Sequence, residues 1–296
     1  MKEDIQEYNH NAVPGEPGTL YLCATPIGNL EDMTYRAVRV LGEVALIAAE
    51  DTRHTRQLLT HFDIHTRLTS YHEHNKYEKE AELIDYLLAG NDLACVSDAG
   101  LPGIADPGSA LAQAAIAAGI RVVPLPGANA ALSALIASGL DTTRFSFVGF
   151  LPRTKQKRRE RLAEVAAETE TLLFYEAPHH LKETLKDILQ ALGDRRAVLA
   201  RELTKRYEEF RRGKLSELLA AYQSEEPRGE FVIVLEGANE EAKAAAEKEK
   251  IVVTPAERVA QLLAEGIDRK EAMRRTAKEL GLSRRDVYQA CLEAEG

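Results

Sequence analysis

Short apolar runs alternate with helix-like segments through the first half of this sequence. The runs at 19–23, 44–49, 93–97 and 121–124 have the length and aliphatic content of buried strands. Between them lie segments with apolar residues at helical spacing, as at 109–118. Such a strand–helix–strand alternation predicts a mostly parallel sheet covered by helices on both faces.

The pattern changes after Gly139, where predicted strands follow one another more closely. Apolar runs predict strands at 145–150, 171–175, 197–201, 208–212 and 230–235, with helices near 158–167, 180–192 and 216–222. This arrangement indicates a mixed sheet with some hairpin connections. We therefore expect a two-domain α/β protein, with an N-terminal domain over 18–138 and a C-terminal domain over 139–237.

The remaining segments have a different character. Residues 1–17 are polar, without the apolar core of a signal peptide, and are expected to form a flexible lead. Residues 238–250 are rich in Ala, Glu and Lys without an apolar stripe, which predicts a linker. Residues 251–296 then show helical periodicity with Gly281 in a turn, which predicts a small all-helical domain with helix-turn-helix spacing.

Composition narrows the class of protein. Of 296 residues, 45% are hydrophobic and 29% charged, as in soluble globular domains, and no apolar run is long enough to span a membrane. The three cysteines are scattered, which suits a reducing cytoplasm and argues against a cysteine-based metal site. A net charge of −9 argues against a nucleic-acid partner, except where positive charges cluster locally.

Four loops follow predicted strands of the first domain. They lie at 24–30, 49–56, 97–108 and 124–130, and the third contains repeated Gly and Pro. Ligands of open α/β sheets bind at the carboxyl ends of the strands, so four such loops predict a lined cleft for a polar ligand. The Walker and dinucleotide fingerprints are both absent. These residues alone therefore leave the ligand unnamed.

Taken in order, the loops and several later segments resemble a known motif set. The segments are Thr25-Pro26-Ile27-Gly28-Asn29-Leu30, Ala49-Glu50-Asp51-Thr52-Arg53, the loop at 97–108, Pro124-Leu125-Pro126-Gly127, Gly149-Phe150-Leu151-Pro152-Arg153, Tyr175-Glu176-Ala177-Pro178-His179, Arg201-Glu202-Leu203-Thr204-Lys205 and Gly229-Glu230-Phe231. They are similar to those of the RsmI family of 16S rRNA (cytidine-2′-O)-methyltransferases, within the tetrapyrrole-methylase superfamily. The resemblance covers about residues 18–237, and in our interpretation the helical tail as well.

This resemblance implies a two-domain tetrapyrrole-methylase fold with S-adenosylmethionine in the cleft between the domains. It also implies methyl transfer to the ribose 2′-oxygen of a decoding-centre cytidine in 16S rRNA of the small ribosomal subunit, and a homodimer. The residues expected to bind the cofactor are Pro26, Asp98, Ala99, Gly100, Pro102, Ile104, Ala128, Asn129, Ala130, Tyr175, Glu176, Phe231 and Val232.

A methyl acceptor with a weakly acidic hydroxyl is helped by a general base or by a group that stabilises its alkoxide. We expect Asp51 or Glu202 to handle the proton and Arg53, Arg201 or Lys205 to bind phosphate. Glu50, Asp98 and His54 are further candidates on the same loops. The alternative is that the acidic and basic residues form salt bridges between the domains. His72 and His74 resemble a metal pair, but lack a third ligand, so no metal site is expected.

Basic clusters are the expected contacts to the RNA backbone. The residues are Arg153, Lys155, Lys157, Arg158 and Arg159 after the Gly149 turn, and Arg274, Arg275, Arg284 and Arg285 in the tail. The alternative for such a charge run is a solvated helix face.

Two other functions compete with rRNA methylation. One is a methylase of a small tetrapyrrole on the same fold, and the other is a nucleic-acid-binding regulator with a ligand-sensing α/β part. The first loop here is Thr-Pro-Ile-Gly-Asn, whereas the tetrapyrrole-acting members carry Gly-Pro-Gly. That departure and the basic clusters favour an RNA substrate, and the lined cleft favours an enzyme.

Overall fold

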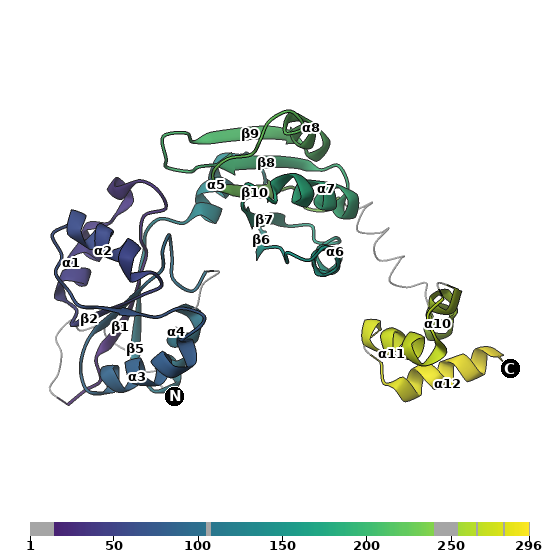
Figure 1. The fold of residues 1–296 in the computed structure, drawn as a ribbon, viewed down its shortest axis with the longest axis horizontal. Coiled ribbons are helices and arrows are strands. Elements are labelled where there is room, and N and C mark those ends of the chain that lie inside the picture. The colour runs from purple at the N-terminus through teal and green to yellow at the C-terminus, as the bar shows by residue number, and fades with distance from the viewer. Residues whose placement is uncertain (1–14, 105–107, 240–253, 265, 281, 296) are drawn as a thin grey trace. The chain divides into compact units, whose positions relative to one another are not determined.

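The fold is described from a computed structural model (Figure 1). It describes residues 15–104, 108–239, 254–264, 266–280 and 282–295. Most of the expected lead over 1–17 and of the expected linker over 238–250 lies outside these ranges, as does Gly281.

The first sheet is entirely parallel. Its five strands run in the order β3-β2-β4-β1-β5, and every pair of neighbours is parallel. The strands are β1 (Thr19–Cys23), β2 (Leu46–Ala49), β3 (Leu68–Ser70), β4 (Leu93–Val96) and β5 (Arg121–Leu125). The predicted mostly parallel sheet is confirmed.

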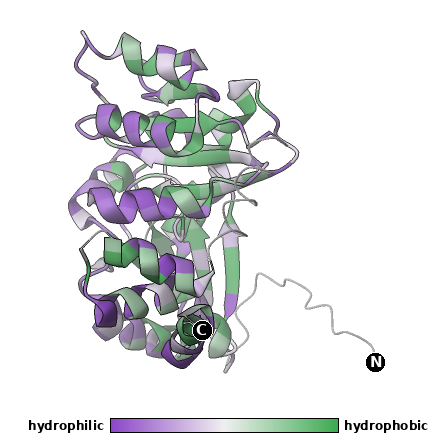
Figure 2. Cartoon of the chain, turned by 90° about the vertical axis from the view of Figure 1, so that its right-hand side faces the viewer, coloured by the Kyte–Doolittle hydropathy of each residue, from purple (hydrophilic) through white to green (hydrophobic). Residues whose placement is uncertain are grey.

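Helices cover both faces of this sheet, because successive strand side chains point to opposite faces. Tyr21 and Cys23 pack in one apolar cluster with α1 (Tyr35–Glu43) and α2 (Thr52–His61). Leu20 packs in the other cluster, with α3 (Lys76–Leu88) and α4 (Gly108–Ala117). Figure 2 shows the resulting division, with largely hydrophobic strands and hydrophilic outer faces on the helices.

Two elements around the first sheet differ from what the sequence predicted. The segment at 49–56, expected to be a loop, instead begins helix α2: the Asp51 side chain accepts a hydrogen bond from the Arg53 amide and caps the helix. The buried residue Leu59 then packs α2 against the sheet. Strand β3 was not expected at all, because it is only three residues long and half-buried at the sheet edge.

The second sheet is mixed, as predicted. Its order is β6-β7-β10-β8-β9, with β6 parallel to β7 and the other neighbours antiparallel. The strands are β6 (Phe145–Phe150), β7 (Thr171–Glu176), β8 (Arg196–Arg201), β9 (Glu209–Lys214) and β10 (Phe231–Leu235). The central strand β10 is buried along its whole length, which accounts for its unbroken apolar sequence.

Helix α5 (Ala130–Ser138) belongs to the second sheet by packing, although it directly follows the first. Its residues Ala131, Ala134 and Leu135 pack in one cluster with strand residues of β7, β8 and β10. The boundary expected at 138/139 leaves this helix with the first domain, whereas its apolar side chains contact the second sheet. The segment between β5 and α5 therefore carries the chain from one lobe to the other.

Three more helices complete the second half of the α/β region (Figure 1). They are α6 (Lys155–Glu164), α7 (Leu181–Leu192) and α8 (Leu215–Ala221). Helix α7 buries Leu181, Leu185 and Ile188, and it also contacts α8.

The C-terminal region is all-helical, as predicted. It comprises α10 (Pro255–Ala264), α11 (Arg269–Glu279) and α12 (Arg284–Glu295). These helices share a core of their own, formed by Val259, Leu262, Ala272, Ala277, Val287 and Cys291. Within the described ranges, no helix has both the length and the apolar character needed to cross a bilayer.

Candidate functional site

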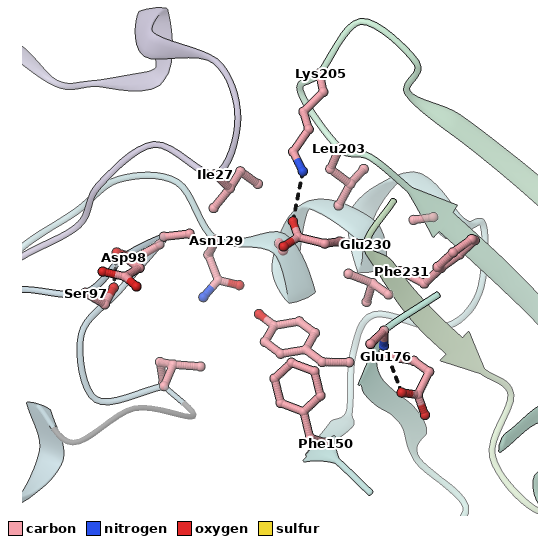
Figure 3. A pocket seen from close by; sticks show the side chains of 18 of the residues that line it. Ile27, Ser97, Asp98, Asn129, Phe150, Glu176, Leu203, Lys205, Glu230 and Phe231 are labelled. Atoms are coloured by element: carbon pink, nitrogen blue, oxygen red, sulfur yellow. Dashed lines mark hydrogen bonds and ion pairs between the residues drawn. The ribbon is translucent and has the colours of Figure 1, made fainter. Parts of the chain in front are cut away.

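A pocket of about 530 Å³ lies where the carboxyl-end loops of the first sheet meet the second sheet. Such a volume is typical of a site for a small organic ligand. Its lining residues are Ile27, Glu50, Ser97, Asp98, Ala99, Gly100, Leu101, Ile104, Asn129, Ala130, Phe150, Tyr175, Glu176, Ala177, Pro178, His179, Ala200, Leu203, Lys205, Glu230, Phe231 and Val232. Figure 3 shows Ser97 and Asp98 on one side, Leu203 and Phe231 on the other, and Asn129 between them.

The first-sheet side of the pocket is built by two loops fastened to each other. Thr25 and Gly100 exchange backbone hydrogen bonds of 2.9 and 3.0 Å. The Thr25 hydroxyl also donates to the Ser97 carbonyl oxygen at 3.1 Å, and this contact is buried. The loop after β1 therefore holds the loop after β4 in place, and with it the neighbouring Asp98.

Asp98 is itself held by a third loop. Its Oδ1 accepts a hydrogen bond from the Asp51 amide at 2.9 Å, at the point where β2 passes into α2. One carboxylate oxygen is thus committed to the protein, which orients the whole group at the pocket wall. An oriented carboxylate of this kind can bind a hydroxyl or an ammonium group of a ligand.

Tyr175 connects the second-sheet wall with the start of α5. Its hydroxyl oxygen accepts a hydrogen bond from the Ala131 amide at 3.2 Å. Its ring makes edge-to-face contacts with Phe147 and Phe150, at centroid distances of 5.0 and 5.5 Å. Burial raises the pKa of Tyr175 above its ordinary value, so the phenol stays neutral. This wall is therefore aromatic, and a hydrogen bond attaches it to the start of α5.

The neighbouring Glu176 has a structural role. Its side chain is buried and accepts a hydrogen bond from the Ala177 amide at 2.8 Å (Figure 3). It also accepts one from the Thr184 hydroxyl at 2.5 Å. One carboxylate oxygen is therefore bound by the segment after β7 and the other by Thr184 of α7. Glu176 forms part of the pocket wall without offering a free carboxylate.

Lys205 brings a positive charge to the pocket, between two carboxylates. Its Nζ donates to Glu202 Oε1 at 2.8 Å. It also donates to Glu230 Oε2 at 2.9 Å (Figure 3). Burial lowers the pKa of Lys205, but the two carboxylates outweigh it and raise that pKa overall. Burial likewise raises the pKa of Glu202, and hydrogen bonds from Lys205 and the Glu230 amide lower it overall. Both groups are therefore charged at neutral pH.

The backbone around this lysine adopts a conformation that is uncommon for its residue types. Glu202 has φ +50° and Thr204 has φ +65°, both in the left-handed region. A Cβ on Gly229, which has φ +83°, would lie 2.3 Å from Cγ of Glu202. Strain of this kind persists where the surroundings enforce it, often at functional sites. The turn at 202–205 is thus shaped to hold Lys205.

Gly28 of the first lobe makes room for the same lysine. A Cβ on Gly28 would lie 2.4 Å from Cγ of Lys205. We expect Gly28→Ala to displace the lysine from its carboxylates. The methyl transfer that the sequence resemblance implies should then slow roughly tenfold to a hundredfold, because small displacements at a reacting centre carry penalties of that size. Steady-state kinetics measures this effect. Gly42→Ala is the matched control, because a Cβ there meets nothing within 4 Å. Equal activity of both variants would contradict the prediction.

The other residues expected to take part in catalysis lie outside the pocket lining. Arg53 binds Asp51 with two hydrogen bonds, Nε to Oδ1 at 3.1 Å and Nη2 to Oδ2 at 2.8 Å. These bonds hold the pKa of Asp51 well below its usual range. Arg201 donates to the Arg228 carbonyl oxygen at 2.7 Å and to Glu209 at 3.2 Å. Lys205 thus lines the pocket, whereas Asp51, Arg53, Arg201 and Glu202 stand around it.

Most residues expected to bind the cofactor do line the pocket, the exceptions being Pro26, Pro102 and Ala128. Other lining residues were not named individually from the sequence, although Ile27 and Leu101 lie in loops expected to contact the cofactor. These residues are Ile27, Ser97, Leu101, Phe150, Ala177, Pro178, His179, Ala200, Leu203 and Glu230. Several of these stand inside the motifs quoted above, beside residues that were chosen. The apolar residues among them could not be recognised as pocket residues from the sequence, because an apolar strand residue has the same side chain whether it lines a pocket or packs in a core.

The basic segment after β6 divides into exposed and buried cations. Arg153, Lys155, Lys157 and Arg159 are exposed. Arg158 is 2% exposed and forms ion pairs of 2.7 Å with Glu183 and Asp187. The expectation that Arg158 contacts RNA therefore does not match its position, because its guanidinium is turned inward to bind these carboxylates.

The tail arginines also fall into two groups. Arg274 and Arg275 are exposed, but both bind Glu271, at 2.6 and 3.0 Å. Arg284 and Arg285, at the start of α12, are exposed and have no ion-pair partner among the residues described. The second pair is the more available for binding an anion.

His72 and His74 lie near each other, with ring centroids 6.0 Å apart. No cluster of three or more His, Cys, Asp or Glu side chains suited to a metal ion occurs in the part of the chain that the structure describes.

Comparisons with known proteins place this architecture in a family. The model of the tetrapyrrole (corrin/porphyrin) methylases matches residues 19–219. Two solved structures share the fold, each with a TM-score of 0.53. One is uroporphyrin III C-methyltransferase from Thermus thermophilus, 17% identical over 73% of this chain and 97% of that one. The other is a cobalt precorrin-4 methyltransferase, 16% identical over 74% of this chain and 94% of that one.

Curated relatives are far more similar in sequence. Ribosomal RNA small subunit methyltransferase I of Halalkalibacterium halodurans is 51% identical over 92% of this chain and 94% of the relative. The protein of that name from Bacillus subtilis is 48% identical over 92% and 94%, and the one from Synechocystis 48% over 94% and 99%. The chain therefore belongs to the tetrapyrrole (corrin/porphyrin) methylase family and, within it, to the group of ribosomal RNA small subunit methyltransferase I.

Proposed function

We propose that this enzyme transfers a methyl group from S-adenosylmethionine to the ribose 2′-oxygen of a decoding-centre cytidine in 16S rRNA of the small ribosomal subunit, in the cytoplasm. The observation that carries this proposal is the sequence identity of about half over nearly the full chain, shared with relatives named for methylation of small-subunit rRNA. The pocket and its charged rim support it.

The residues around the pocket suit this cofactor chemically. The second-sheet wall offers aromatic and apolar side chains, Tyr175, Phe231 and Val232, against which an adenine ring can pack. The opposite wall offers the carboxylate of Asp98 and the amide of Asn129. The Asn129 Oδ1 caps α5 by accepting from the Leu132 amide at 2.9 Å, which leaves its NH₂ group as the donor. These groups would bind the hydroxyl, ammonium and carboxylate groups of the cofactor.

S-adenosylmethionine supplies, when bound, a methyl group on a positively charged sulfur. The chain has to orient the acceptor oxygen and to manage its proton. Lys205 lies at the pocket with a fixed positive charge, so we assign it the stabilisation of negative charge on the acceptor oxygen. Of the two carboxylates expected to take the proton, Glu202 contacts Lys205 and Glu230, which both line the pocket. Asp51 instead has both oxygens bound by Arg53.

The exposed cations are the proposed contacts to the RNA backbone. Arg153, Lys155 and Lys157 follow the pocket residue Phe150 closely in the chain, and Arg53 is exposed at the start of α2. Phosphate contacts by Lys and Arg supply most of the sequence-independent affinity for RNA. In the tail, Arg284 and Arg285 are proposed to dock the same substrate.

The test uses small ribosomal subunits from a strain that lacks this gene. Purified protein and labelled S-adenosylmethionine are expected to methylate one cytidine of 16S rRNA on its ribose, located by mapping the modified nucleotide. Labelling of a base, or transfer to a tetrapyrrole precursor but not to the subunits, would contradict the proposal. Titration of the cofactor in the absence of RNA tests its binding separately.

We further infer that the protein is a homodimer. Leu132 and Ile136 stand one helical turn apart on α5 and are 44% and 77% exposed, so they present an apolar surface. Light scattering is expected to give twice the mass of the chain, and Ile136→Glu to shift the protein towards monomer. Ile116→Glu is the control, because Ile116 is 65% exposed on a different helix. A monomeric native protein would refute the inference.

A further inference from the structure

One cation of the basic segment is enclosed by protein. The Nε of Arg158 donates to Asp187 Oδ2 at 2.8 Å, and its Nη2 lies 2.7 Å from both Glu183 and Asp187. The Asp187 side chain is as buried as that of Arg158, with each 3% exposed. A buried, two-point ion pair therefore connects the start of α6 with α7.

The same guanidinium also binds the backbone that precedes α6. Its Nη1 donates to the Arg153 carbonyl oxygen at 3.1 Å and to that of Pro152 at 3.5 Å. Those two residues form the turn between β6 and α6. Arg158 thus fastens this turn to α7 by contacting backbone on one side and carboxylates on the other.

The fastened turn begins next to the pocket, and exposed cations lie on it and on the first turn of α6. Phe150 lines the pocket, and Arg153 stands three residues later, at most about 11 Å along the chain. Arg153, Lys155 and Lys157 are exposed, and their side chains form no ion pair among the residues described. By contrast, Arg159 donates to Gln190 at 2.7 Å. Among the described cations of this segment, Arg158 and Arg159 therefore have protein partners, whereas Arg153, Lys155 and Lys157 form no ion pair.

We propose that Arg158 is a positioning residue for RNA binding, which holds the turn so that Arg153, Lys155 and Lys157 meet backbone phosphates beside the acceptor nucleotide. This role rests on the proposed function. Arg158 itself touches no RNA, because its side chain is buried and ion-paired with Glu183 and Asp187. Holding the backbone in advance lowers the entropy that the long side chains lose when they bind. A buried ion pair contributes little net free energy of folding compared with apolar residues of similar size. The Arg158 ion pair is therefore better explained by a role in orienting the turn than by a role in stability.

The variant has to remove the ion pair without leaving a buried charge. Arg158→Met alone would leave the buried Asp187 carboxylate with only its longer contact to Arg159, at 3.7 Å, and would therefore destabilise the fold. The test therefore uses Arg158→Met combined with Asp187→Leu in the full-length protein. Thermal unfolding and titration with S-adenosylmethionine are expected to match the native protein. Binding of a fluorescent single-stranded RNA is expected to weaken about tenfold.

A double-mutant cycle separates positioning from direct contact. Lys155→Ala is expected to weaken RNA binding several-fold in the native background and to have almost no further effect once Arg158 and Asp187 are replaced, because the turn is then no longer held. Lys214→Ala, an exposed lysine at the end of β9, is the control and should leave RNA binding unchanged in both backgrounds.

Two results would overturn the assignment. Native RNA affinity of the Arg158→Met, Asp187→Leu protein would show that the ion pair does not position the turn. Additive effects in the cycle would show that Arg158 and Lys155 act independently. If the native protein fails to methylate small subunits but the cycle is non-additive, the proposed function fails while the positioning role stands. Methylation together with an additive cycle removes the positioning role alone.

Discussion

Replacing Lys205 with methionine is expected to lower the rate of methyl transfer by roughly a hundredfold to a thousandfold, the range found when an enzyme loses one group that stabilises developing negative charge. Methionine keeps an unbranched side chain beside Gly28 but removes the ammonium group that Glu202 and Glu230 hold at the pocket. Single-turnover kinetics with saturating cofactor and subunits measures the effect. Cofactor affinity is expected to change little.

The pH dependence of this loss follows from the two pKa shifts. The pKa of Glu202 lies below its ordinary 4.5, so its carboxylate is lost only as the pH falls through that lowered value. The pKa of Lys205 lies above its ordinary 10.5, so its ammonium is lost only as the pH rises through that raised value. The loss in Lys205→Met should therefore be constant from about pH 6 to 9.

The control is Lys186→Met, at an exposed lysine of α7 that does not line the pocket. It should retain native turnover across the same pH range. Native turnover of Lys205→Met, or a loss that disappears within this range, would contradict the role given to Lys205.

The second large effect is expected from Asp98→Asn, which should weaken binding of S-adenosylmethionine by about tenfold to a hundredfold. A hydrogen bond to a charged group contributes about 1.5–3 kcal/mol, which corresponds to that change in affinity. Asparagine keeps an oxygen that can accept from the Asp51 amide, so the loop after β2 stays attached and only the charge is lost. Equilibrium titration of the cofactor measures the result.

Asp85→Asn provides the matched control, because Asp85 is exposed on α3 and away from the pocket lining. It carries the same chemical change and should bind the cofactor normally. If Asp98→Asn also binds normally, Asp98 contributes to the loop architecture alone, through its contact with the Asp51 amide.

Elements with a strong periodic pattern could be predicted from the sequence. Strand β6 (Phe145–Phe150) was predicted at its observed bounds, and β4 and β10 to within one residue, because apolar runs of this length must be buried. The start of helix α2 was not predicted, because its buried face is short and the sequence of its first turn, Thr52 to Thr55, is typical of a polar loop. What makes it a helix is the cap provided by Asp51 and the cover provided by the sheet.

The candidate site shows the same division. The loop at 97–108 and the position of Asp98 at a strand end could be predicted from the sequence, because parallel strands bring their carboxyl ends to one edge of the sheet. The sequence did not show which charged side chains face the pocket. Lys205 and Arg201 lie four residues apart with similar neighbours, yet only Lys205 lines the pocket, because the left-handed backbone at Glu202 and Thr204 turns the chain between them.

The sequence by itself determined the alternating strands, the two kinds of sheet, the helical tail and the motif set that marks the family. Only the tertiary structure decided that α5 packs on the second sheet and that Arg158 faces inward. The physical reason is that periodicity records whether a face is buried, whereas it carries no information on the partner that buries it. Arg158 and Lys157 are neighbours of the same charge, and Asp187, 29 residues further along the chain, separates their roles.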